Sequence, residues 1–144
     1  MELNYTGKYL LATSNHYYSQ RMLSLSPSIR YFLCRHPTDM RKSFDGLGGV
    51  ITSNMRQDML TGDVFIFLNK RRTHIKLLLW ESDGFAIYYK RLEQGTFELP
   101  VVSIVTHPPA ITHQELLLIL QGISLKNIHY RKRYQKKSLS YPQV

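Results

Sequence analysis

The sequence contains a single cysteine, Cys34. One thiol can form no disulfide within the chain and cannot supply a cysteine-rich zinc site. Because Cys34 follows the apolar run Tyr31-Phe32-Leu33, we expect a buried structural thiol rather than a nucleophile. No segment approaches the roughly 18 consecutive apolar residues of a membrane span, and the N-terminus lacks the apolar core of a signal peptide. These absences predict a cytoplasmic protein that does not bind a membrane.

Sequence signatures of catalysis are also missing. Gly46-Leu47-Gly48-Gly49 lacks the following Lys-Ser/Thr pair of a phosphate-binding loop, and no Gly-x-Ser-x-Gly motif occurs. Two-metal catalysis requires carboxylates that converge on ions about 4 Å apart, whereas Asp39 and Asp45 would lie on different faces of a helix. We therefore predict no catalytic residue, no metal and no cofactor. A nuclease whose carboxylates are brought together only by the fold remains an alternative, with Asp39, Asp63 and Glu81 as its candidates.

Basic residues, in contrast, are abundant. Lysine and arginine number 19 against 10 aspartates and glutamates, for a net charge of +9. Such an excess favours polyanionic partners through long-range attraction, although charge alone leaves a merely soluble basic protein open. With 144 residues, 43% of them hydrophobic and 20% charged, the chain has the composition of one ordinary globular domain with its own core.

Three apolar segments in the middle of the chain predict an antiparallel meander. They are Val64 to Leu68, Ile75 to Trp80 and Phe85 to Leu92, and they are rich in β-branched and aromatic residues. Lys70-Arg71-Arg72-Thr73 forms a polar tip between the first two segments. Asp83-Gly84, between the second and third, is a strong hairpin signal because both residues tolerate a positive φ.

A strand and a helix are predicted before the meander. The strand runs from Ile29 to Arg35, and Thr38 or Asp39 can cap the helix that follows it. Several glycines in this helix predict that it is short and that residues 52 to 61 form a connection. The helix would present an apolar stripe to the sheet, consisting of Met40, Phe44, Leu47 and Ile51.

After the meander, the segment from Val101 to Val105 is a candidate edge strand. Thr112 can cap a second helix, from His113 to Leu120, and Gly122 can end it. In that helix Leu116, Leu117 and Leu120 are expected to face the core.

These elements predict an α+β fold. Its antiparallel sheet has about four strands in the order β-α-β-β-β, with one helix packed on a face and a C-terminal helix. Residues 1 to 21 are polar and rich in tyrosine and predict a flexible leader, with Met22 as a candidate start codon. Residues 22 to 125 then form a single domain, and residues 126 to 144 a basic tail.

The basic residues that we predict to bind nucleic acid fall into three groups. The first lies at the start of the first helix, the second on the meander and the third in the tail. Cations beside aromatic side chains suit phosphate contact combined with stacking on bases, although a solvated helix face and a disordered solubilising tail remain open. The candidates are Arg41, Lys42, Lys70, Arg71, Arg72, Lys76, Lys90, Arg91, Arg131, Lys132 and Arg133.

Several motifs resemble a known family, and together they span about residues 23 to 123. The first is Pro37-Thr38-Asp39-Met40-Arg41-Lys42-Ser43-Phe44-Asp45-Gly46-Leu47. The second is Gly62-Asp63-Val64-Phe65-Ile66-Phe67 with Asn69-Lys70-Arg71-Arg72, and the third combines Ile75-Lys76-Leu77-Leu78-Leu79-Trp80, Asp83-Gly84-Phe85 and Tyr89-Lys90-Arg91-Leu92-Glu93-Gln94-Gly95. In this order the motifs resemble the TnpB-type accessory protein, encoded by the second reading frame, of the insertion sequence sixty-six transposon family.

The resemblance implies an accessory factor for transposition that is encoded beside a separate, larger transposase. It implies no enzymatic activity, so it supplies no catalytic residue. The partners expected from it are the DNA at the ends of the element and the transposase itself. DNA binding, docking of the transposase without specific DNA binding, and cryptic nuclease activity are our three hypotheses, in that order, and the oligomeric state stays open.

Overall fold

A computed structural model describes residues 25–101, 107–127 and 129–137. The predicted leader lies outside these residues, as does the candidate edge strand apart from Val101, which is exposed. The elements are β1 (Tyr31–Leu33), α2 (Phe44–Val50), the π-helical η1 (Ile51–Met55), β2 (Val64–Leu68), β3 (His74–Trp80), β4 (Phe85–Arg91), β5 (Ala110–Ile111) and α3 (His113–Gln121).

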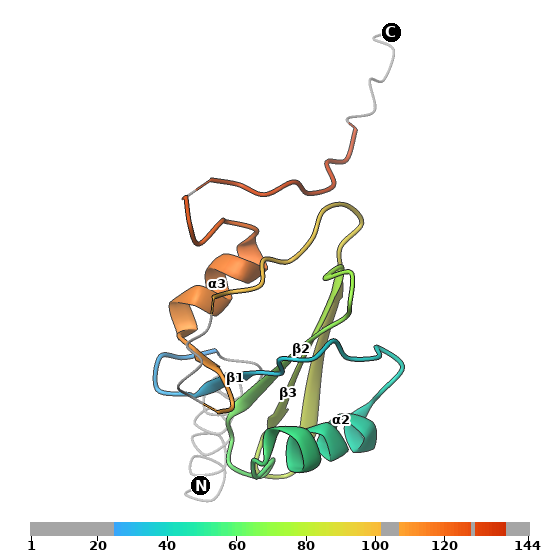
Figure 1. The fold of residues 1–144 in the computed structure, drawn as a ribbon, viewed down its shortest axis with the longest axis vertical. Helices are drawn as coiled ribbons and strands as arrows, with labels where there is room; N and C mark the ends of the chain where they lie inside the picture. The colour runs from blue at the N-terminus through green and yellow to red at the C-terminus, as the bar shows by residue number, and fades with distance from the viewer. Residues whose placement is uncertain (1–24, 102–106, 128, 138–144) are drawn as a thin grey trace, which may run out of the picture.

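The five strands form one sheet in the order β4-β3-β2-β1-β5 (Figure 1). Strands β2, β3 and β4 are the predicted antiparallel meander. Strand β1 runs parallel to β2, with Tyr31 opposite Val64, because the chain crosses over through α2 before it re-enters the sheet. The short β5 pairs antiparallel with the other side of β1. The predicted α+β class is therefore confirmed, and the sheet is mixed because of the β1–β2 pair.

The two helical segments cover opposite faces of the sheet. Successive side chains of a strand point to opposite faces, and all five residues of β2 are buried. Phe65 and Phe67 pack with Leu47 of α2 in one core cluster. Ile66 packs with Leu116 of α3 in the other. A strand covered on both faces reads as a continuous apolar run, which is the pattern that β2 shows in the sequence.

The first helix differs from its prediction at both ends. It begins at Phe44, after Ser43 as N-cap, rather than at Met40. Its glycines do not end it, because the helical turns continue through η1 and finish where Arg56 takes the left-handed conformation, with φ of 53°. Gly48 instead allows the Met59 side chain to pack closely against the helix, because a Cβ atom at Gly48 would lie 2.9 Å from Sδ of Met59.

The hairpin and the second helix were predicted more closely. The β3–β4 turn is confirmed, but its positive φ, 71°, falls on Ser82, one residue before the Asp83-Gly84 pair. The Glu81 N–H donates to the Gly84 carbonyl (2.8 Å) and closes the turn. Helix α3 begins after Thr112 and ends at the left-handed Gly122, as predicted, and the structure adds a capping box between Thr112 and Glu115. Of the predicted core residues of α3, Leu116 is buried and Leu120 packs against the same cluster, whereas Ile119 is buried instead of Leu117.

Candidate nucleic-acid interface

The β2–β3 turn presents three exposed cations, Lys70, Arg71 and Arg72. Asn69 holds this turn in shape: its side-chain oxygen accepts from the backbone N–H groups of Thr73 (2.9 Å) and His74 (3.0 Å). The Arg72 N–H also donates to the Asn69 carbonyl (3.0 Å). Within the described part of the chain, none of the three cations forms an ion pair. The turn therefore presents unneutralised positive charge on a fixed backbone.

The segment after β1 brings another cation to the same end of the sheet. It follows β2, with the Cys34 N–H donating to Ile66 (2.9 Å) and the Thr38 N–H donating to Leu68 (2.8 Å). The exposed Arg35 between them has no ion-pair partner among the described residues. Cys34 is buried, as predicted.

A small pocket of about 160 Å³ lies where these two segments meet. Its wall includes Arg35 and His36 from the segment after β1, and Lys70 and Arg72 from the β2–β3 turn. Sequence reasoning missed Arg35, since 35 residues separate it from Lys70. Only the parallel pairing of β1 with β2 brings them together.

The end of β4 contributes the predicted Arg91 and Lys90. Arg91 is exposed and forms an ion pair with Glu93 (2.8 Å). Lys90 points to the other face, where its Nζ donates to the Leu120 carbonyl in the last turn of α3 (3.4 Å). A cation there interacts favourably with the negative end of the helix dipole. Arg91 is thus the better placed of the two to meet an external anion.

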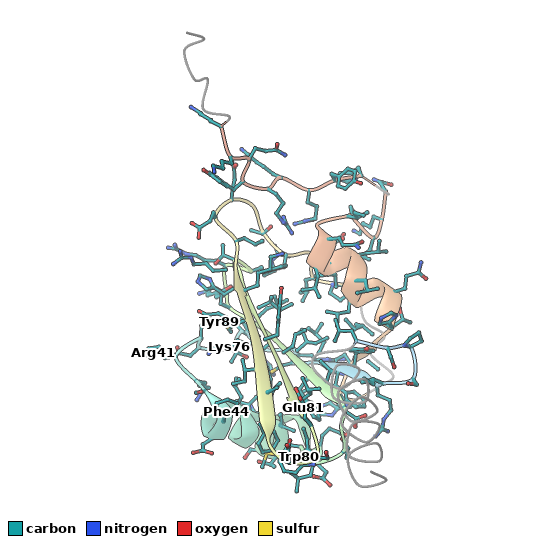
Figure 2. The ribbon with its side chains drawn as sticks, turned by 180° about the vertical axis from the view of Figure 1, so that it is seen from behind. Arg41, Phe44, Lys76, Trp80, Glu81 and Tyr89 are labelled. Atoms are coloured by element: carbon teal, nitrogen blue, oxygen red, sulfur yellow. The ribbon has the colours of Figure 1, made fainter. Side chains whose placement is uncertain are left out.

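Lys76 is buried, with 6% of its surface exposed. Its Nζ donates to the carbonyls of Met40 (2.8 Å) and Lys42 (2.7 Å) and lies 4.6 Å from the centre of the Tyr89 ring. The amine therefore fastens the loop before α2 to the sheet. Figure 2 shows Lys76 and Tyr89 together, with Arg41 on the loop beside them. Lys76 thus holds the loop that carries Arg41 and Lys42, two other residues predicted to bind nucleic acid. Its own amine is hydrogen-bonded to backbone carbonyls of the protein.

Arg41 and Lys42 are both exposed, but Arg41 is paired. Its guanidinium binds the carboxylate of Asp39, with an Nη2–Oδ2 distance of 2.7 Å. The Asp39 carboxylate also accepts from the Arg41 backbone N–H (2.9 Å), so it closes a turn before α2 rather than capping the helix. The hydrogen bonds from the Arg41 side chain lower the pKa of Asp39 to about 2.

Two of the three predicted tail residues face inward. Arg131 donates to the Thr96 hydroxyl (2.9 Å) and Arg133 to the Thr96 carbonyl (3.1 Å). Burial lowers the pKa of Arg133, and the nearby Arg131 adds to the effect. Lys132 between them is exposed. These arginines thus attach the tail to the loop that follows β4. The same loop is joined to the β2–β3 turn, because the Phe97 N–H donates to the Arg72 carbonyl (2.7 Å).

Two of the three nuclease candidates, Asp63 and Glu81, lie at the opposite end of the sheet. Asp63, just before β2, is buried and accepts two hydrogen bonds from Arg30, at 2.9 and 2.8 Å. Glu81 lies in the β3–β4 hairpin, and Asp39 is bound to Arg41 near the basic end, so the three nuclease candidates do not form one cluster. In the described ranges no group of three or more His, Cys, Asp or Glu side chains is placed to hold a metal ion. Helices long and apolar enough to cross a membrane are likewise absent from those ranges.

The chain matches a family model and two curated proteins. The model, described as IS66 Orf2 like protein, covers residues 29–130. The uncharacterized protein y4jC of Sinorhizobium fredii is 31% identical over 81 residues, which make up 56% of this chain and 69% of that protein. The uncharacterized protein y4hO of the same strain is 26% identical over 106 residues, or 74% of this chain and 90% of that protein. No solved structure matches the chain. The chain belongs to the IS66 Orf2-like family, as its motifs predicted, and its role is accessory to the transposition of an insertion sequence.

Proposed function

We propose that the protein is a non-catalytic, cytoplasmic accessory factor that binds DNA at the ends of its insertion sequence. The contact surface is the basic end of the sheet, which we define as Arg35, Lys70, Arg71, Arg72 and Arg91. The observation that carries the proposal is the convergence of these cations from three separate segments. Four of the five have no acidic partner among the described residues, and the fifth, Arg91, pairs with an exposed glutamate.

Unpaired cations held on a fixed backbone suit the phosphates of nucleic acid. Each phosphate that a cation neutralises releases condensed counterions, so the affinity gained is large at low salt and falls steeply as salt is added. The pocket between Arg35 and Lys70, at about 160 Å³, has room for a phosphate group. Arginine can also bind two phosphate oxygens at once, which fixes orientation as well as charge.

The other predicted cations support this surface in different ways. Arg41, Lys42 and Lys132 are exposed and extend it. The remaining members have side chains that bond to the protein itself, so in our proposal they position the surface rather than contact phosphates. They are Lys76, Lys90, Arg131 and Arg133.

Fluorescence anisotropy of the full chain tests the proposal. The probes are the terminal inverted repeat of the element and a scrambled duplex, measured from low to physiological salt. We expect tighter binding to the repeat that persists at physiological salt. Replacing Lys70 and Arg71 with glutamine should weaken binding to both duplexes and reduce the slope of log affinity against log salt by about one unit for each residue that contacts a phosphate.

Arg56→Gln is the matched control, because Arg56 is exposed, lies in the connection between η1 and β2, and is not one of the residues of the basic end. It should leave affinity and salt dependence unchanged. Equal loss in Arg56→Gln and in the Lys70→Gln/Arg71→Gln variant would show that net charge, and not the basic end, governs binding. Cleavage of the probe on addition of Mg²⁺ would contradict a non-catalytic role.

A second candidate function, docking of the transposase, is favoured by a different observation. Phe44 of α2 is 46% exposed and Tyr89 of β4 is 50% exposed, and both lie on the same side of the sheet (Figure 2). Exposed aromatic residues are common anchors of protein interfaces. In that case transposase binding would survive the Lys70→Gln/Arg71→Gln changes and weaken in Tyr89→Ala, while DNA binding would show no preference for the repeat.

A further inference from the structure

Strand β4 is an open edge of the sheet. It contains seven residues, and all seven pair with β3 in a regular antiparallel register. On its other side no strand lies among the described residues. Unpaired edges of this kind are templates for another strand, and proteins usually block them with prolines, bulges or very short strands. The opposite edge is short, since β5 has two residues, whereas β4 has seven and contains neither a proline nor a bulge. Its charged residues, Lys90 and Arg91, are its last two.

The backbone of β4 has a defined set of outward hydrogen-bonding groups. Hydrogen-bonded and non-hydrogen-bonded pairs alternate along an antiparallel ladder. Leu92 N–H donates to the Thr73 carbonyl and Glu81 N–H to the Gly84 carbonyl, so Ala86, Tyr88 and Lys90 bond inward to β3. The N–H and C=O groups that point away from the sheet consequently belong to the alternate residues Phe85, Ile87, Tyr89 and Arg91.

The residues along this edge are complementary to themselves. Suppose that two copies of β4 pair antiparallel with Ile87 opposite Ile87 of the second copy. Phe85 then lies opposite Tyr89, and Asp83 lies opposite Arg91. Aromatic pairs and opposite charges are the cross-strand neighbours that stabilise a sheet. The half-exposed Tyr89 would gain an aromatic neighbour, and each Arg91, now beside the exposed Glu93, would gain a second carboxylate.

Two other arrangements fit less well. Shifting one copy by two residues, so that Ile87 faces Tyr89, places Asp83 opposite Glu93, and like charges in that position are unfavourable. A parallel arrangement would set the basic end of one copy beside the basic end of the other. The antiparallel arrangement instead sets the acidic hairpin of each copy, with Glu81 and Asp83, beside the basic end of its neighbour.

We propose that the protein forms a symmetric homodimer in which two β4 strands pair antiparallel about Ile87, so that the two sheets become continuous. The occupant of the open edge is a second copy of this chain. The pairing uses the backbone of β4 together with Asp83 and Arg91. Of the basic end, Arg91 enters this interface, whereas Arg35, Lys70, Arg71 and Arg72 lie outside the paired strands, so the dimer can form without DNA.

Sedimentation equilibrium of the full chain over a wide concentration range, combined with residue-level amide hydrogen exchange, tests the dimer. A monomer–dimer equilibrium is expected, with slow exchange at the Ile87 and Tyr89 amides that speeds up on dilution. The Ala86 and Tyr88 amides, bonded within the monomer, should exchange slowly at every concentration.

A charge swap tests the register. Arg91→Asp and Asp83→Arg each place two pairs of like charges in the interface, and each should raise the dimer dissociation constant by about tenfold or more. The double variant Asp83→Arg/Arg91→Asp restores both pairs and should dimerise nearly as well as the natural chain. Arg35→Glu is the matched control: it also reverses a basic residue, but at the end of β1, and should leave dimerisation intact. Circular dichroism and thermal melting confirm that each variant is folded.

Several outcomes would overturn the proposal. One is a monomer at all concentrations whose Ile87 and Tyr89 amides exchange freely. Another is a monomer in which those amides are protected, since a segment of the same chain would then cover β4. Protection of those amides in a monomeric chain only after transposase is added would assign the edge to the transposase. A dimer that keeps its strength in both single variants would have a different interface.

Discussion

The two ends of the sheet differ in how their charges are paired. Where β2 begins, the buried carboxylate of Asp63 is paired with Arg30. Where β2 ends, most cations of the basic end have no ion-pair partner among the described residues. Asp63 accepts from Arg30 twice and from the Thr61 hydroxyl, and it joins the starts of the parallel strands β1 and β2. Lys70 and Arg71 on the β2–β3 turn bond to no described carboxylate. The pairing of Asp63 with Arg30 stabilises the fold, whereas unpaired cations such as Lys70 repel their neighbours and are available to a binding partner. The position of a charge in this sheet therefore indicates its role.

The largest effect is expected at the paired end. Asp63→Ala should lower the free energy of unfolding by about 2–3 kcal/mol, because it removes a buried carboxylate that accepts hydrogen bonds from Arg30 and Thr61 and joins the starts of β1 and β2. Urea denaturation measures the change. Lys70→Ala and Arg71→Ala are the controls from the unpaired end, and each should alter the free energy by no more than about 0.5 kcal/mol. Equal losses at the two ends would remove the distinction between them.

Lys76 is a cation near the basic end that serves the fold. Lys76→Met keeps most of the side-chain volume but leaves the carbonyls of Met40 and Lys42 without their donor. The expected loss is about 1–2 kcal/mol. Amide exchange should accelerate in the loop from Asp39 to Ser43.

Lys42→Met is the control for Lys76→Met, since the Lys42 side chain is exposed. Its stability and loop exchange should stay near those of the natural protein. If both variants behaved alike, the amine of Lys76 would not be what holds the loop.

The smallest effect concerns the exposed pair of Asp39 with Arg41. Because the pKa of Asp39 is lowered to about 2 from 3.8, the stabilisation from this pair is present above the ordinary pKa and is lost as the pH falls through about 2. Titration of the carboxyl carbon by NMR should show the low pKa in the natural chain and a higher value in Arg41→Gln, which loses the side-chain hydrogen bonds and keeps the backbone one. An unchanged pKa in Arg41→Gln would mean that the backbone turn, and not the guanidinium, holds the carboxylate.

Local patterns in the sequence predicted the elements whose structure depends on near neighbours. The meander, the cap of α3 at Thr112 and its end at Gly122 are all of this kind. The start of α2 was predicted too early because the apolar periodicity extends through Met40. The turn closed by Asp39 takes up residues 39–42 before the helix begins. Local signals place an element well, but its first residue depends on which of two competing hydrogen-bonding patterns the backbone adopts.

The candidate site was predicted in part. Lys70, Arg71 and Arg72 stand together in the sequence, so their cluster was visible. Arg35 was not, because its nearness to Lys70 arises from the pairing of β1 with β2 across the α2 crossover. The sequence also could not show that the amine of Lys76 bonds to the backbone. A lysine that alternates with apolar residues looks the same whether its amine meets solvent or two carbonyls.

The position of β1 has a consequence for how the protein is made. This three-residue strand lies between β2, which follows it by some thirty residues, and β5, which the chain reaches at Ala110. A chain emerging from the ribosome can form the β2–β3–β4 meander from nearby segments, but β1 cannot be enclosed until residue 111 has left the exit tunnel. Contacts between distant segments form late because they close long loops. Tyr31 and Leu33, which pack with Leu116 and Ile119 of α3, would therefore stay uncovered on that face until α3 has been made.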